Sequence, residues 1–268
     1  MRSAVRGEAR GAADAAERQG PRAYAGGTAS TAVRVALVSQ FAGRHQFAVI
    51  ARHPSAVLLV VQLAGVLLYP FTEQTLAGRV AFEAFGALVL ALAIWSVRDS
   101  PGPTWIAIGL AFAASALSIS DVVRHSPGQL VVSNALHAVF YFWAAVNLMI
   151  YMLADAEITT DELFAVGATF TLVAWAFAYV FSVVQQLQPG SFLTSFSPAP
   201  NRAWTELLFL SFTNLSSTGI SDIVPVTPVS RSVVMIEQIA GLGYVALFVS
   251  RLVGLTLSRH IISSRSDG

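Results

Sequence analysis

The sequence predicts an all-α integral membrane protein, because three observations agree. Of its 268 residues, 55% are hydrophobic and only 12% are charged, and the mean hydropathy is +0.64. Uncharged stretches recur at the length, about 20 residues, that a helix needs to cross the hydrocarbon core of a bilayer. Short connections rich in Pro, Gly or acidic residues separate these stretches. This composition excludes an ordinary soluble domain.

Six candidate membrane spans follow one another along the chain. Four carry no formal charge when His53 is neutral, namely 53–72, 100–120, 125–154 and 163–201. The other two, 80–97 and 232–250, each contain one carboxylate, Glu83 and Glu237. Residues 1–53 precede them with eight arginines against three acids. We expect this stretch to be a basic, largely disordered cytoplasmic arm, with an amphipathic surface helix over 33–50 as an option.

The arginines predict the orientation of the spans. All 16 basic residues are arginine, and six crossings from a cytoplasmic N-terminus leave twelve of them inside the cell. The four that fall outside are Arg79, Arg124, Arg202 and Arg231. Because basic residues accumulate on the cytoplasmic side, we expect a multi-pass protein of the cell membrane with both termini in the cytoplasm. Residues 259–268 are then a short cytoplasmic tail without a regulatory domain.

Several function classes are excluded or disfavoured. The absence of cysteine excludes thiolate metal sites and disulfides, and a net charge of +1 gives no reason to expect nucleic acid. No span pairs a nucleophile with a base or collects metal ligands, so we expect neither an enzyme nor a cofactor. The fourth span, 130–153, has no arginine and cannot be a voltage sensor. Two interpretations of His137 are open. It forms a polar site with Asn134 and with Asp121 or Glu83, or it packs within the helical core, which is the interpretation that we favour.

The segment 188–228, between the fifth and sixth spans, differs from the other connections. It is strongly apolar in its middle and contains five prolines. Residues 203–215 predict a helix too short to cross a bilayer, followed by a polar run from Ser216 to Asp222. Irregular backbone at membrane depth is tolerated only inside protein or beside water. The sequence therefore predicts a re-entrant loop here.

The run Ser217-Thr218-Gly219-Ile220-Ser221-Asp222, hereafter the filter segment, resembles the Thr-Val-Gly-Tyr-Gly-Asp signature of potassium-channel pore domains. Pro225, Thr227 and Arg231 follow at the spacing of that family, and Gly241 falls at its gating-hinge position. The surrounding sequence is similar to bacterial six-segment relatives over about residues 161–258. The resemblance implies a pore domain over 155–258, whereas the four-helix membrane domain expected over 54–154 rests on the candidate spans and matches that family only in number.

The resemblance further implies a homotetramer, because a filter with one loop per chain needs four chains around an axis. Carbonyls of Ser217, Thr218 and Gly219 would face a permeant monovalent cation, K⁺ or Na⁺, and Asp222 would lie at the outer mouth. The filter tyrosine is replaced by Ile220 and the second glycine by Ser221. A side chain is strained in the left-handed conformation by about 1 to 2 kcal/mol, so we expect weakened potassium selectivity.

Some roles stay open at this stage. Glu237 is costly in hydrocarbon, and we favour a supporting role behind the filter segment, bonded to Ser211 or Thr213. Gly241 and Gly243 either form a hinge or allow helices to approach closely. A non-conducting membrane scaffold or sensor with the same fold is the alternative function. A secondary transporter is disfavoured, because such proteins have two interrupted segments and only one is present here.

Overall fold

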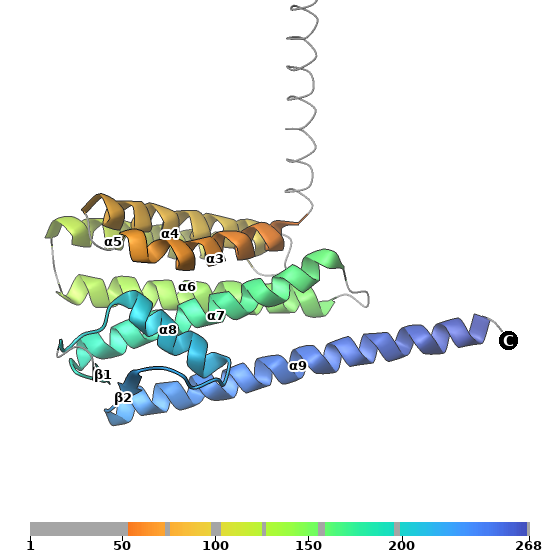
Figure 1. Cartoon of the computed structure of the whole chain (residues 1–268). Coiled ribbons are helices and arrows are strands. Elements are labelled where there is room, and N and C mark those ends of the chain that lie inside the picture. The colour runs from red at the N-terminus through yellow and green to blue at the C-terminus, as the bar shows by residue number, and fades with distance from the viewer. Residues whose placement is uncertain are drawn as a thin grey trace, which may run out of the picture. The chain divides into compact units, whose positions relative to one another are not determined.

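The computed structural model describes residues 53–72, 76–97, 103–124, 127–154, 159–195 and 199–266. Residues 1–52 lie outside these ranges, and with them the expected basic arm and its surface helix. Within the described ranges the chain is mostly helical, which confirms the predicted helical class (Figure 1).

Each predicted span coincides with a helix. These helices are α3 (Pro54–Thr72), α4 (Leu76–Val97), α5 (Thr104–Arg124), α6 (Pro127–Ala154), α7 (Thr160–Leu187) and α9 (Pro228–Ser266). By length and composition, three of the described helices can cross a membrane, namely α6, α7 and α9. The apolar parts of α3, α4 and α5 are shorter. A further helix, α8 (Trp204–Leu215), occupies the position of the predicted short helix.

The structure adds three details that the sequence prediction did not contain. The fifth span ends at Leu187, because Pro189 follows and disfavours helical backbone at Gln188 before it. The last helix runs from Pro228 to Ser266, so the predicted tail mostly continues this helix. A small antiparallel sheet, β1 (Phe192–Thr194) with β2 (Ile223–Pro225), was not predicted. Its three-residue strands are too short to show the alternation that identifies a strand.

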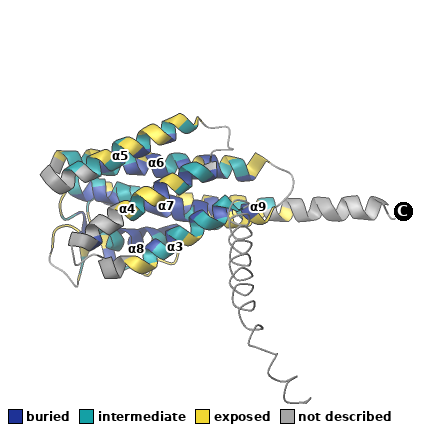
Figure 2. Ribbon diagram, turned by 90° about the horizontal axis from the view of Figure 1, so that it is seen from above, coloured by how far each residue is buried: buried dark blue, intermediate teal, exposed yellow. Residues whose placement is uncertain are grey.

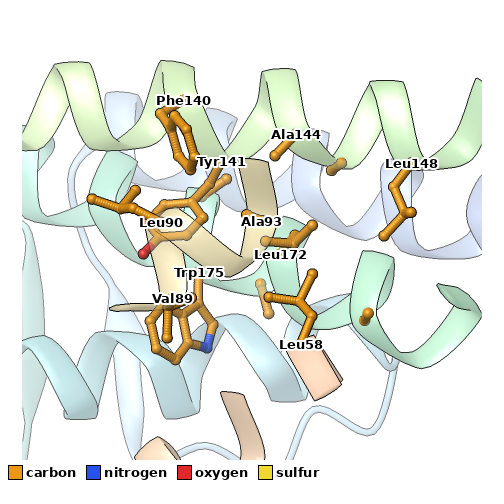
Figure 3. Packing of buried hydrophobic residues seen from close by; sticks show 14 of the residues in the cluster. Leu58, Val89, Leu90, Ala93, Phe140, Tyr141, Ala144, Leu148, Leu172 and Trp175 are labelled. Atoms are coloured by element: carbon orange, nitrogen blue, oxygen red, sulfur yellow. The ribbon is translucent and has the colours of Figure 1, made fainter. Parts of the chain in front are cut away.

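Helix α7 is the centre of the packing, since it contacts α3, α6, α8 and α9 (Figures 1 and 2). Alanines on α7 at 165, 168, 174, 176 and 178 are buried and let neighbouring helices approach closely. The larger core side chains lie between these small residues. Tyr141 of α6 and Trp175 of α7 meet edge to face, with ring centroids 5.6 Å apart (Figure 3).

Helix α9 is much less covered than α7. Only 22% of its apolar span is buried, against 56% for the span of α7. It contacts α8 and α7, and among the α9 residues whose burial is described, several Met, Ile, Leu and Val side chains are exposed. A single chain therefore leaves the apolar surface of its last helix largely unpartnered.

Polar contacts join three helices at one end of the fold. The Arg251 guanidinium of α9 lies 3.3 Å from a carboxylate oxygen of Glu162, in the first turn of α7. The neighbouring Asp161 accepts hydrogen bonds from the backbone N–H of Ser55 at 3.2 Å and from its hydroxyl at 2.9 Å. The start of α3, the start of α7 and Arg251 of α9 therefore lie together.

Candidate functional site

Helix α8 is fixed at its N-terminal end by buried polar contacts. The side-chain amide of Gln185 donates to the carbonyl of Arg202 at 2.9 Å, and its oxygen accepts from the Arg202 N–H at 2.8 Å. The carboxylate of Glu206 accepts from the N–H of Ala203 at 2.6 Å. At about 1.5 Å per residue, twelve residues span roughly 18 Å, well short of a bilayer core. Helix α8 is therefore too short to cross a membrane.

The filter segment begins with a turn that closes the C-terminal end of α8. The N–H of Ser217 donates to the carbonyl of Asn214 at 3.0 Å, and the N–H of Thr218 donates to that of Thr213 at 3.0 Å. This pair of bonds is the Schellman termination, in which the residue after the cap adopts a left-handed conformation. Ser217 does so, with φ of 60°, where glycine is usual.

This turn directs the amides of the filter segment back toward α8. The N–H of Gly219 also donates to the Thr213 carbonyl, at 3.1 Å. Within the part of the chain that the structure describes, the carbonyl oxygens of residues 217–219 accept no hydrogen bond, and all three residues are exposed. Three exposed carbonyls without a protein partner therefore follow the end of a helix whose C-terminus carries partial negative charge.

The outer half of the filter segment has a different geometry. Gly219 has φ of 66°, whereas Ser221 is not among the described residues with positive φ. The Ser221 hydroxyl instead accepts from the N–H of Ile223 at 3.1 Å, and Ile220 is 74% exposed. The left-handed positions are thus 217 and 219, where the family signature leads one to expect 219 and 221.

Asp222 is exposed at the end of the filter segment. Its carboxylate accepts from the hydroxyl of Thr194 at 2.8 Å. The strands β1 and β2 bring these two residues together, since Thr194 is paired with Ile223. This contact is compatible with both roles considered for Asp222, namely concentrating cations and shaping the turn. The sheet fixes where the charge is placed.

Glu237 lies behind α8, as the supporting role requires. It is fully buried on α9, and its carboxyl is hydrogen-bonded to the hydroxyl of Ser211. Asn214 of α8 is a second neighbour of this carboxyl. The Thr213 hydroxyl donates instead to the carbonyl of Leu210 at 2.8 Å. Of the two partners that the sequence offered, the structure selects Ser211, and Thr213 contributes its backbone carbonyl to the filter turn.

The two glycines of α9 differ in their surroundings. A Cβ added at Gly241 would lie 2.1 Å from the carbonyl oxygen of Leu215, the last residue of α8. A Cβ added at Gly243 would meet nothing within 4 Å. Helix α9 is continuous through both positions. Gly241 therefore permits the close approach of α9 to the end of α8, while Gly243 faces open space.

His137 packs within the helical core. Its Nδ1 lies 2.9 Å from the Ser133 carbonyl, and its ring stacks on Tyr179 with centroids 4.7 Å apart. Both contacts are those of a packing histidine. The side chains of Glu83 and Asp121 lie outside the described part of the structure, so the polar site that would include them is not described. The described residues contain no cluster of three or more His, Asp or Glu that could hold a metal ion.

The sequence did not reveal three contacts of this region. These are the Gln185 bonds to Arg202, the Thr194 bond to Asp222, and the ion pair of Arg251 with Glu162. The sequence indicated them only indirectly, because each contact involves a polar residue near a predicted membrane span. Their partners are 17, 28 and 89 residues away, beyond any local pattern.

Comparison with family models matches residues 167–257 to the family described as ion channel. The match begins within α7, includes α8 and the filter segment, and ends within α9. It does not extend to α3–α6. Comparisons with curated proteins and with solved structures gave no match.

Proposed function

We propose that this membrane protein, whose residues 167–257 are a pore domain of the ion channel family, assembles as a homotetramer that conducts monovalent cations. The observation that carries this proposal is the set of exposed carbonyls without a protein partner at residues 217–219, which follow the C-terminal end of α8. Carbonyl oxygens of this kind replace the hydration shell of a cation when four copies surround an axis.

The exposed surface of α9 supports the assembly of four chains. One loop per chain supplies only one row of carbonyls, so an ion site needs symmetric copies. The face of α9 with Leu242, Val245, Val249 and Val253 is at least half exposed in the single chain. These residues recur every three or four positions, so they share one side of the helix. This face lines the proposed pore below the filter.

The polar end of the fold supports the proposed number of crossings, because it places the start of α3, the start of α7 and Arg251 of α9 on the same side. Glu162, Arg251 and the start of α3 lie together, and all three fall on the cytoplasmic side when α3–α7 and α9 each cross the membrane. Six crossings with both termini in the cytoplasm therefore agree with these contacts and with the distribution of arginines. The mouth with Asp222 then faces outward, where carboxylates attract cations.

The selectivity and gating of the proposed channel follow from residues that are missing. Ile220 and Ser221 replace the tyrosine and glycine of the potassium signature, so potassium is selected only weakly over sodium. Helix α6 carries no arginine, so the channel has no steep intrinsic voltage dependence. Tail currents that required several gating charges would contradict this second statement.

Cation flux into liposomes, measured with the purified full chain, tests conduction. Gly219→Val places a branched side chain at φ of 66° in the filter segment and should abolish flux. Gly190→Val is the matched control, because Gly190 has φ of 83° and equally open surroundings but lies in the turn before β1. Flux that survives Gly219→Val, or that both variants lose equally, would favour the non-conducting scaffold or sensor.

A further inference from the structure

An apolar cavity of about 610 Å³ lies between α6, α7 and α9. Its walls come from these three helices and from Leu215 at the end of α8. They are also the three described helices that are long and apolar enough to span a membrane. The lining contains no charged residue, and the hydroxyl of Tyr244 is already used, since it donates to the Val166 carbonyl at 2.6 Å.

The cavity faces away from the proposed pore. It uses the side of α9 that carries Ile236, Ala240, Gly243 and Leu247, spaced three or four residues apart. At 100° per residue, this side is roughly opposite the one with Leu242, Val245 and Val249. The cavity is also closed on one flank by α6 and α7 of the same chain. Ile236 and Leu247 on this side are 59% and 39% exposed, so the cavity is open along α9. Its position opposite the proposed pore face, and not enclosure, directs it away from an axis shared by four chains.

The cavity is continuous with the membrane-facing surface of α6. Phe142 and Met149 of α6 line it, while Val139, Val146 and Ile150 beside them are 52%, 53% and 43% exposed. Neighbours three or four residues apart lie side by side on a helix. The exposed stripe, defined here as Val139, Val146 and Ile150, thus adjoins the cavity without a polar rim.

Bound water and an empty space are both energetically unfavourable in such a cavity. A bound water needs two to four polar partners, which the lining does not offer. An empty space of this size forfeits the dispersion contacts of every side chain around it. Hydrocarbon satisfies the lining without requiring a hydrogen bond, and lipid is the hydrocarbon that always surrounds a membrane protein.

We propose that one acyl chain of a membrane phospholipid occupies this cavity, entering from the exposed stripe of α6 and reaching Leu215 behind the filter segment. The inference rests on the proposed membrane-embedded tetramer, because that assembly places the cavity at bilayer depth and away from the axis. A lipid tail that moves from the surrounding lipid into the cavity gains no hydrophobic free energy. Van der Waals packing against the lining therefore holds the chain in place.

Photolabelling tests this proposal with the full chain in liposomes of phosphatidylcholine that carries a diazirine on one acyl chain. Mass spectrometry should find adducts on Met149 and Leu247 several-fold denser than on Val146 and Ile150. Gly243→Trp fills the cavity from α9, where a side chain meets open space, and should remove most cavity adducts. Val132→Trp, at a half-exposed position of α6 outside the lining, should leave them unchanged.

Several results would overturn the proposal. Cavity adducts no denser than those on the exposed stripe would do so, as would adducts that Gly243→Trp leaves intact. If that variant loses its native oligomeric mass, Ala240→Leu fills the same side of the cavity with a smaller change. Because the chain has no cysteine, Ile236→Cys reports a competing occupant. Efficient crosslinking of this cysteine between chains by a short bis-maleimide would place a second copy in the cavity.

None of these measurements depends on ion flux. A chain that is labelled in the cavity but does not conduct would leave this inference standing and contradict the proposed function. A conducting tetramer without cavity labelling would contradict this inference and leave the proposed function standing.

Discussion

Ser211 of α8 and Glu237 of α9 join the helix before the filter segment to the last helix through one buried hydrogen bond. The Ser211 hydroxyl also lies 2.8 Å from the carbonyl oxygen of Ala174 on α7. A hydroxyl has one proton, and both a carbonyl and an ionised carboxylate only accept. The bonds are complete when Glu237 is protonated and donates to Ser211, which in turn donates to Ala174.

This proton count predicts that Glu237→Gln preserves the structure. The glutamine amide supplies the donor that a protonated carboxyl would supply, and it has nearly the same shape. We expect the thermal midpoint of the purified variant to stay close to that of the wild type. Glu237→Leu removes the donor from Ser211 and should cost about 1–3 kcal/mol.

An ionised Glu237 would reverse the order of stability of Glu237→Gln and Glu237→Leu. In that case Ser211 donates to the carboxylate, and the glutamine amide adds a second donor that faces the same hydroxyl. Glu237→Gln would then be the more harmful change. Ser211→Ala in the Glu237→Gln background serves as the control, because it removes the hydroxyl from both schemes.

Gly241→Ala should destabilise the protein, whereas Gly243→Ala should not. The added methyl at 241 would lie 2.1 Å from a backbone oxygen of α8, which cannot rotate away as a side chain would. Forcing the helices apart typically costs about 1–3 kcal/mol. Gly243→Ala is matched in helix and residue type and meets open space, so its thermal midpoint should be unchanged or slightly higher.

A hinge at Gly241 leads to a different expectation for Gly241→Ala. If flexibility is what the glycine provides, Gly241→Ala would change the open probability in planar bilayers while the thermal midpoint stays near that of the wild type. Measuring both quantities for both glycine variants separates the two roles.

Much of this fold could be predicted from where charges are absent. Stretches with no charge or a single carboxylate located the six long helices among the described residues, and the length of residues 203–215 identified α8 as too short to cross. Both predictions rest on local quantities, namely the cost of charge in hydrocarbon and the rise of a helix. The filter segment was found through a motif, whose spacing to Pro225 and Arg231 is also local.

The contacts that required the fold were those between distant residues. Gly241 and Gly243 are equivalent in sequence, and only the position of Leu215 distinguishes them. Ser211 and Thr213 were equal candidates for Glu237 until the rotation of α8 placed one of them toward α9. The strand that brings Thr194 to Asp222 was missed because three residues form no recognisable period.

The ion pair between Arg251 and Glu162 should stabilise the packing of α9 against α7. Their side chains are 15% and 6% exposed, so removing one partner leaves a largely buried charge. We expect Arg251→Met and Glu162→Gln each to lower the thermal midpoint, with a coupling of about 0.5–3 kcal/mol in a double-mutant cycle.

A second pair provides the matched comparison for this cycle. Arg202 and Glu206 are 4.0 Å apart, with side chains that are 1% and 41% exposed. Because the two charges are at the outer limit of an ion pair and water reaches the Glu206 carboxylate, we expect their cycle to give a smaller coupling than that of Arg251 with Glu162. Similar couplings for the two pairs would show that Arg251 and Glu162 do not act as a buried pair.

Restoring the potassium signature at the outer half of the filter segment should sharpen selectivity. Ile220→Tyr with Ser221→Gly removes the side chain that disfavours a left-handed residue at 221. The same change deletes the hydroxyl that accepts from Ile223 at 3.1 Å, which frees the backbone to adopt the new conformation. Reversal potentials in opposed potassium and sodium gradients should move toward the potassium equilibrium potential. Ser221→Ala with Ile220→Tyr is the control, since it removes the hydroxyl without providing glycine. If wild-type protein already excludes sodium strictly, or if the control sharpens selectivity as much as the glycine variant, then the side chain at 221 does not determine which ion passes.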